Sequence, residues 1–220
     1  MKFIGLALTL CISLMASANE NDLKHRPKSF SVSGGKAVFV DFTEANYEII
    51  YDLNQKQASV KADILFDAPE SGLPIFDSVE APTAILLDGQ PVTSIETATP
   101  GHETTVRVIH QSVSVGTHRM SISVPLTELV EFKAQGVKSA FWTSDLDERQ
   151  YLERYLPANF EFDQVKMTFL IKFVGAKNKQ TIYTNGQVSQ LDASTFKVTY
   201  PEYYTASSIF YHAVYSGAVD

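Results

Sequence analysis

Hydrophobic and polar residues alternate along most of this chain, with the period of a β-strand. In residues 165–173 the apolar side chains all fall on one side: Val165, Met167, Phe169, Ile171 and Phe173. Residues 58–66 repeat the pattern, with Val60 and Ile64 alternating against Lys61 and Asp63. This pattern predicts strands with one buried and one solvated face, as in antiparallel sheets.

The remaining strands are predicted from short runs rich in Val, Ile, Phe and Tyr. They lie at residues 36–42, 47–53, 83–87, 104–111, 117–124, 139–143, 181–183, 196–200 and 209–215. Asp88-Gly89 predicts a two-residue hairpin after the strand at 83–87, and Asn185-Gly186 predicts a second tight turn. Residues 104–111 and 117–124 are expected to pair as a further hairpin.

Helical patterns are scarce. Residues 145–155 are the best candidate, because Asp145 can cap the first turn and Glu148 follows three residues later. Residues 126–133 could add a turn or two. We therefore predict an all-β fold, an antiparallel β-sandwich or saddle of about a dozen strands with one or two short helices.

The first eighteen residues have the pattern of a secretory signal peptide. Lys2 precedes a short apolar run, and Ala16-Ser17-Ala18 is a small-residue cleavage site. The apolar run is too short for a membrane span, which needs about 20 residues. Cys11, the one cysteine, lies in this segment after the bulky Leu10, which argues against lipid attachment.

This pattern predicts a secreted or periplasmic protein, cleaved after Ala18, without disulfides. Residues 1–18 are then the signal peptide, residues 19–29 an exposed leader, and residues 30–220 a single β-domain. The composition is 45% hydrophobic with a net charge of −7, which allows a sizeable core and argues against nucleic-acid binding.

No catalytic motif or metal site is predicted. A zinc peptidase helix needs His-Glu-x-x-His, but the string that begins at His102-Glu103 has Val106 in the fifth position. His110 and His118 flank the hairpin predicted above and could hold a metal with a carboxylate, although two solvated sheet residues are the simpler interpretation. The acidic residues around the candidate helix could serve acid–base chemistry or be surface charge: Asp145, Asp147, Glu148, Glu153, Glu161 and Asp163.

Residues 145–173 resemble the end of the N-terminal β-domain of the aminopeptidase N family of zinc metallopeptidases. A charged stretch ends at Pro157, an aromatic and acidic turn follows, and Lys166-Met167-Thr168-Phe169 opens the next strand. Residues 181–188 and 195–210 resemble the turn and the last two strands of that domain. The family's acidic positions become Glu161 and Asp163, and its second proline is replaced.

The resemblance implies a non-catalytic β-domain that covers the active site of a gluzincin domain outside this sequence. That missing domain would carry the zinc, which is the expected cofactor, and would cleave N-terminal residues from peptides. The expected partners are this catalytic domain and a peptide substrate; neither nucleic acid nor a membrane span after signal removal is expected. The family lends a polar side chain to the substrate amine near this loop. Asp145 is the nearest substitute here, and capping a helix is its competing role.

The alternative is a free-standing periplasmic or secreted β-sandwich that binds a partner. Its surface would use a dense group of aromatic residues: Tyr200, Tyr203, Tyr204, Phe210 and Tyr211. Alternation could instead bury many of these rings. An enzyme that uses the acidic loop is a third possibility.

Overall fold

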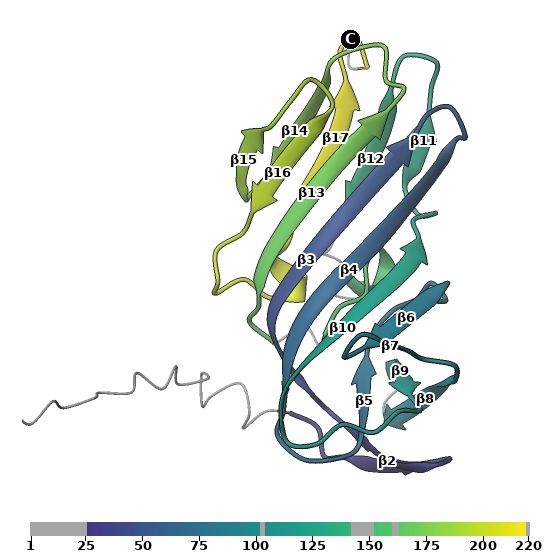
Figure 1. Cartoon of the computed structure of the whole chain (residues 1–220). Coiled ribbons are helices and arrows are strands. Elements are labelled where there is room, and N and C mark those ends of the chain that lie inside the picture. Colours follow the sequence, from purple (N-terminus) through teal and green to yellow (C-terminus); the bar gives the residue numbers. More distant parts are fainter. Residues whose placement is uncertain (1–25, 102–103, 142–151, 160–162, 219–220) are drawn as a thin grey trace, which may run out of the picture.

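The computed structural model describes residues 26–101, 104–141, 152–159 and 163–218 (Figure 1). These residues form seventeen strands and two short 3-10 turns, η1 (Leu152–Arg154) and η2 (Ala206–Ser208). The all-β prediction is confirmed. Among the described residues no helix is long and apolar enough to cross a bilayer.

Eight strands form the largest sheet, in the order β15-β16-β13-β3-β4-β10-β6-β7 (Figure 1). Its long centre is β3 (Asp41–Asp52), antiparallel to β4 (Gln57–Ala68) and parallel to β13 (Lys166–Val174). The other strands are β10 (Gly116–Pro125), β16 (Thr195–Thr199), β15 (Gln187–Gln190), β6 (Ala84–Leu87) and β7 (Gln90–Pro91). The β3–β13 pair makes this sheet mixed, whereas alternation predicted purely antiparallel pairing.

The four-stranded sheet covers one face of this large sheet (Figure 1). Its strands, in spatial order, are β11 (Val130–Phe132), β12 (Val137–Phe141), β17 (Tyr211–Tyr215) and β14 (Gln180–Thr184). Phe141 and Tyr211 of the small sheet lie edge-on to Phe169 of β13, with ring centroids 6.1 and 6.3 Å away. Aromatic side chains thus join the two sheets into the main core.

Burial along the central strands follows the alternation in the sequence. All five apolar residues of the 165–173 pattern are buried, and so are Tyr47, Ile49 and Tyr51 of β3. The polar residues between them lie on the opposite face of the eight-stranded sheet, here called the outer face. The side-chain faces predicted for β4 and β13 are therefore confirmed.

A five-stranded sheet lies at one end of the molecule (Figure 1). Its strands, in order, are β1 (Phe30–Val32), β2 (Gly35–Val38), β5 (Leu73–Phe76), β9 (Thr104–Ile109) and β8 (Ile95–Gly101). Residues 37–40 alternate between two cores: Ala37 and Phe39 enter a smaller second core, while Val38 and Val40 enter the main one. The single strand predicted at 36–42 is therefore two strands, one in each sheet.

Two local predictions are wrong. Residues 104–111 and 117–124 do not form a hairpin, because β9 pairs with β5 and β8 while β10 pairs with β4 and β6. The two strands bury their apolar sides in different cores, so pairing with each other would expose one of them. Residues 126–133 are not helical: Leu129 turns the chain with a φ of 49°, and β11 follows.

Both turn predictions are confirmed. The Asp88-Gly89 hairpin joins β6 and β7, and both of its turn residues have positive φ, as a two-residue hairpin requires. Asn185-Gly186 makes the tight turn expected, although it carries the chain from β14 in the small sheet to β15 in the large one. The Asn185 side chain holds this crossing by bonding the backbone of Ser208 and Phe210.

Candidate functional site

Residues 152–159 form a short segment packed against the main core. Leu152, Tyr155 and Leu156 are buried, and the Tyr155 ring stacks on Phe141 at a centroid distance of 4.8 Å. Of the helix predicted at residues 145–155, the structure describes only the 3-10 turn at its end. Asp145, the predicted amine anchor, lies outside the described residues, as do Asp147, Glu148 and Glu161.

Hydrogen bonds from three parts of the chain fix this segment. Asp77 and Ala158 exchange two backbone hydrogen bonds, of 2.8 and 2.9 Å. The backbone N–H of Val79 donates to the carbonyl of Glu153 at 2.9 Å. From the core side, the hydroxyl of Tyr47 donates to the carbonyl of Pro157 at 2.8 Å. The chain on either side of Pro157 is therefore held in one position.

The Asp163 carboxyl group is the buried polar centre beside this segment, with only 4% of the residue exposed. Its Oδ2 accepts hydrogen bonds from the backbone N–H of Phe42, at 3.1 Å, and from the side-chain amide of Asn159. The same amide also donates to the carbonyl of Val40 at 2.7 Å. Asp163 therefore connects the start of β3 to the 152–159 segment.

Asp163 holds a proton more tightly than an ordinary aspartate. Burial, followed by the negative charge of Asp41, raises the pKa of Asp163 well above its usual value. The two carboxyl groups are also joined by a hydrogen bond. The protonated form of Asp163 is therefore favoured over its carboxylate.

A second acid, the partly buried Asp77, also lies beside the segment. Burial, and then the negative charge of Glu153, raise the pKa of Asp77 to about 7. Arg107 opposes this rise only in part. The Arg107 guanidinium donates to the carbonyls of Ser78 and Val79, at 3.1 and 2.8 Å, and to the hydroxyl of Thr97 at 2.7 Å.

Two pairs of acids thus lie beside Pro157-Ala158-Asn159. Asp77 can take up or release a proton near neutral pH, and as carboxylates all four acids can accept hydrogen bonds from an amine. The described part of the chain contains no group of three or more His, Cys, Asp or Glu side chains placed to hold a metal ion.

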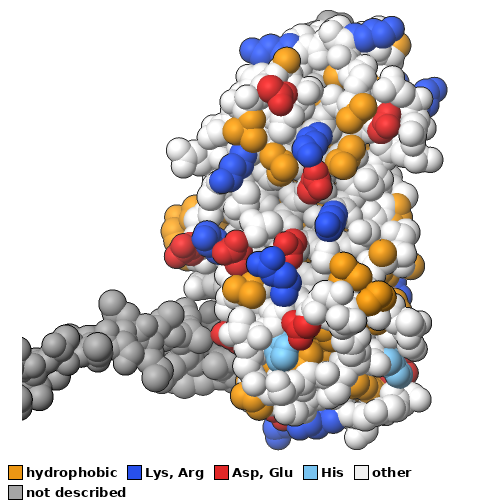
Figure 2. Space-filling view, in the orientation of Figure 1, with side chains coloured by type: hydrophobic (Ala, Val, Ile, Leu, Met, Phe, Trp, Pro, Cys, Tyr) orange, Lys and Arg blue, Asp and Glu red, His pale blue; other side chains and the backbone are white. Residues whose placement is uncertain are grey.

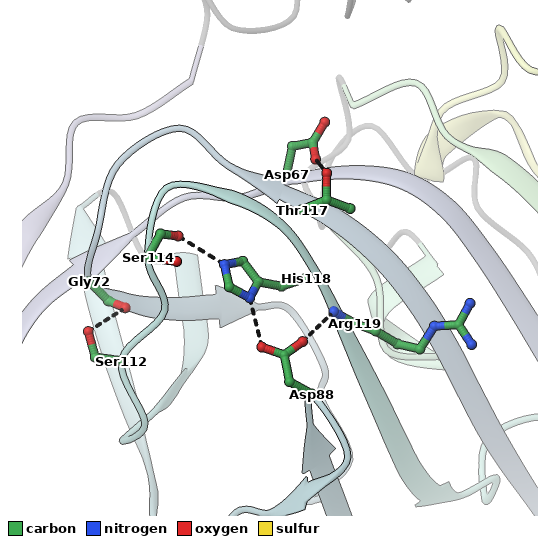
Figure 3. A network of polar contacts seen from close by, with 8 residues as sticks. All are labelled: Asp67, Gly72, Asp88, Ser112, Ser114, Thr117, His118 and Arg119. Atoms are coloured by element: carbon green, nitrogen blue, oxygen red, sulfur yellow. Dashed lines mark hydrogen bonds and ion pairs between the residues drawn. The ribbon is translucent and has the colours of Figure 1, made fainter.

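The two histidines considered as metal ligands lie apart, each beside its own carboxylate. His118 Nδ1 lies 2.7 Å from Asp88 Oδ2, and its Nε2 lies 3.0 Å from the carbonyl of Ser114 (Figure 3). His110 Nε2 lies 3.2 Å from Glu96 Oε2. Asp88 also accepts the backbone N–H of Arg119 at 2.9 Å, so the His118 network ties the β6–β7 hairpin to β10.

The aromatic group proposed as an interaction surface is mostly internal. Tyr200 and Tyr211 are buried in the main core, and Tyr204 and Phe210 are partly buried. Only Tyr203 is well exposed, at 68%. The interaction surface predicted from these five residues does not form.

The sequence pattern pointed to Glu153 and Asp163 as candidate acids but not to Asp41, Asp77 or Asn159. Asp41 lies at the start of a predicted strand and Asp77 after a short apolar run, where an acidic residue is ordinarily solvated. Asp41 and Asp163 are 122 positions apart in the sequence. These pairs could have been predicted only by knowing that residues 152–159 and Asp163 pack beside β3 and β5.

Comparison with known proteins gives structural matches only. No protein-family model matches the sequence, and no curated protein matches it. A two-domain M1 zinc metallopeptidase, solved with bound L-tryptophan, matches with a TM-score of 0.52 at 12% identity, over 79% of this chain and 42% of its own. The M1 zinc metallopeptidase of Deinococcus radiodurans matches with a TM-score of 0.50 at 12% identity, over 81% and 42%.

Leukotriene A4 hydrolase from Saccharomyces cerevisiae matches with a TM-score of 0.56 at 12% identity, over 88% of this chain and 32% of its own. The chain thus spans less than half the length of these proteins. Its fold is similar to that of the N-terminal domain of M1 metallopeptidases. The resemblance that residues 145–210 predicted is confirmed at the level of the fold.

Proposed function

We propose that this chain is the non-catalytic N-terminal β-domain of a secreted zinc aminopeptidase-like protein. It would cover the active site of a gluzincin domain, outside this sequence, that binds zinc and removes N-terminal residues from peptides. The observation that carries the proposal is the extent of the structural match, which takes in 79–88% of this chain but only 32–42% of the two enzymes. The rest of each enzyme has no counterpart in this chain, and the proposed gluzincin domain corresponds to it.

The fixed 152–159 segment supports the proposal. The resemblance is most specific just here, and the hydrogen bonds of Tyr47, Asp77 and Asn159 hold the backbone in a defined position. A domain that shapes one side of an active site needs such a rigid support. Within this proposal, Asp145 holds the amine of the substrate as a carboxylate, and capping a helix is the alternative role.

The reading frame of the gene after Asp220 tests the proposal. We expect it to encode a His-Glu-x-x-His helix, and the complete protein to hydrolyse an aminoacyl chromogenic substrate with zinc. Residues 19–220 alone, supplied with zinc, should show no turnover. A stop codon after Asp220 would favour the free-standing binding module, and zinc-dependent turnover by the chain alone would overturn the proposal.

The amine-anchor role is tested in the complete protein. Replacing Asp145 by Asn should raise KM for a peptide with a free N-terminus, because a carboxylate binds ammonium more strongly than an amide does. If Asp145 caps a helix, Asp145→Asn should leave KM unchanged, since Asn caps nearly as well, while Asp145→Ala should lower the stability.

Export is tested separately, by determining the N-terminus of the protein produced in a secreting host. Cleavage after Ala18 is the expected result. Retention of residues 1–18 on the mature protein would contradict the assignment of a signal peptide.

A further inference from the structure

The outer face of the eight-stranded sheet carries a shallow groove of about 390 Å³. It is lined by residues from four adjacent strands: Asn46, Tyr47, Glu48, Lys61, Asp63, Thr168, Leu170 and Lys197. Figure 2 shows this face, with lysine, arginine and carboxylate side chains spread over its central strands. The groove lies on the side of the sheet opposite to the four-stranded sheet and the 152–159 segment.

Each carboxylate of the groove already has a cation beside it. Glu48 lies 2.5 Å from the ammonium of Lys172, and Asp63 lies 3.4 Å from the guanidinium of Arg119. Lys61 and Lys197 have no ion-pair partner anywhere in the described structure. The lining holds two lysines and two carboxylates, and Lys172 and Arg119 lie just outside it. Because these two outside cations pair with the carboxylates, Lys61 and Lys197 are the charges of the groove that are left without a counter-ion.

The two unpaired lysines stand at opposite ends of one row across the sheet. Lys197 lies opposite Leu170, Leu170 lies opposite Glu48, and Glu48 lies opposite Lys61. Three strand spacings of about 4.8 Å put their backbones about 14 Å apart. In an extended peptide, side chains four residues apart are separated by about 13 Å, so two acidic side chains at that spacing reach both lysines.

We propose that this groove binds an acidic peptide segment of a partner protein, laid across β16, β13, β3 and β4 in an extended conformation. Its carboxylates pair with Lys61 and Lys197, and its backbone lies over Leu170 and Thr168. A small dianion fits less well, because the groove is shallow and would leave most of such a ligand in water. This surface is separate from the 152–159 segment, so the inference does not depend on the proposed function.

The test is fluorescence anisotropy of a labelled seven-residue peptide with glutamates at the second and sixth positions, titrated with the purified chain. We expect saturable binding that weakens as salt rises, because exposed charge pairs are screened. Lys61→Gln with Lys197→Gln should weaken binding roughly tenfold, as expected for the loss of two exposed ion pairs. Lys177→Gln with Lys179→Gln removes two exposed lysines from the β13–β14 connection and should leave binding unchanged.

Three outcomes would overturn the proposal. The first is no binding at low salt, and the second is an equal loss in both double variants, which would show non-specific attraction to lysine. The third is equal binding of a peptide with glutamine in place of glutamate. The assignment of the partner is tested separately with a single-stranded oligonucleotide. If it bound more tightly than the peptide, with the same dependence on Lys61 and Lys197, the groove would prefer a different polyanion and the assignment would be wrong.

Discussion

The hydroxyl of Tyr47 donates a hydrogen bond to the carbonyl of Pro157 across 110 positions of sequence, and both residues are buried. This bond joins the centre of β3 to the segment that the resemblance marks as most specific. A buried carbonyl without a donor costs free energy, so this bond stabilises the fold and helps to hold the segment in position.

Replacing Tyr47 by Phe should lower the free energy of unfolding by about 1–2 kcal/mol, because it leaves the Pro157 carbonyl buried without a donor. Urea unfolding followed by circular dichroism measures the change. Tyr203→Phe removes a hydroxyl from a side chain that is 68% exposed and should have no effect. Equal losses of stability in the two variants would show that the loss does not come from the bond between Tyr47 and Pro157.

Asp77 should make the protein less stable as the pH rises. Burial and the Glu153 charge raise the pKa of Asp77 to about 7 in the folded state, above its ordinary value of 3.8. Its proton therefore stabilises the fold fully below pH 4, and that contribution is lost as the pH rises through 7. Asp77→Asn should unfold at higher urea than the wild type at pH 8 and reduce the difference between pH 4 and pH 8.

The exposed Glu202 provides the matched control, since Glu202→Gln changes the net charge by the same amount without touching Asp77 or Glu153. We expect it to keep the pH dependence of the wild type. An Asp77→Asn variant whose stability falls with pH as steeply as that of the wild type would contradict the role of Asp77.

The stability of the protein should tolerate asparagine at position 163 better than alanine. Asp163→Ala removes the acceptor for the Phe42 N–H and the Asn159 amide and should cost about 2–4 kcal/mol, because two buried donors lose their partner. Asp163→Asn keeps an acceptor oxygen and removes the repulsion with Asp41.

Since the pKa of Asp163 is raised in the folded state, the stabilising effect of its proton declines as the pH rises, and Asp163→Asn should become more stable relative to the wild type from pH 5 to pH 8. Thermal unfolding of the three proteins at pH 5 and pH 8 checks the order. Asn and Ala variants that were equally unstable at both pH values would contradict a raised pKa of Asp163.

Asp88 should show the opposite dependence on pH. Burial alone would raise its pKa, but the Arg119 N–H and His118 outweigh this, so the pKa of Asp88 lies below its usual value. Its contribution is present near neutral pH and is lost as the pH falls through the folded-state pKa. Asp88→Asn, which tolerates the positive φ of this turn, should cost about 1 kcal/mol at pH 7 and less at pH 3.

Guanidinium unfolding at the two pH values measures this difference. Asp88→Ala should be worse than Asp88→Asn at both, since alanine is strained at a φ of 49°. A cost for Asp88→Asn that did not change between pH 3 and pH 7 would rule out an ionic contribution.

Much of the architecture could be predicted because its signals are local. The burial of Met167, Phe169 and Ile171 follows from a two-residue period, and the β6–β7 turn follows from Asp88-Gly89. The predictions were wrong where one strand could pair with either of two partner strands. The pattern of residues 104–124 is correct as strands, but no local signal indicates that Val108 enters the second core and Ile122 the main core.

The candidate site was even less accessible to prediction. Glu153 and Asp163 stood out as acidic residues, yet their interpretation as surface charge or acid–base groups depended on neighbours that the sequence does not specify. Their partners lie far away in the sequence: Asp77 directly follows β5, and Asp41 opens β3. Burial of an acid depends on what covers it, which is a property of the assembled sheets.

The sequence by itself determined the all-β class, the side of each central strand that is buried and the positions of the tight turns, because backbone geometry couples these features to neighbouring residues. Only the tertiary structure decided which strands pair, that β13 runs parallel to β3, and that Asp163 is buried beside Asp41. These features depend on contacts between residues far apart in the chain, whose free energy exists only once both cores have formed.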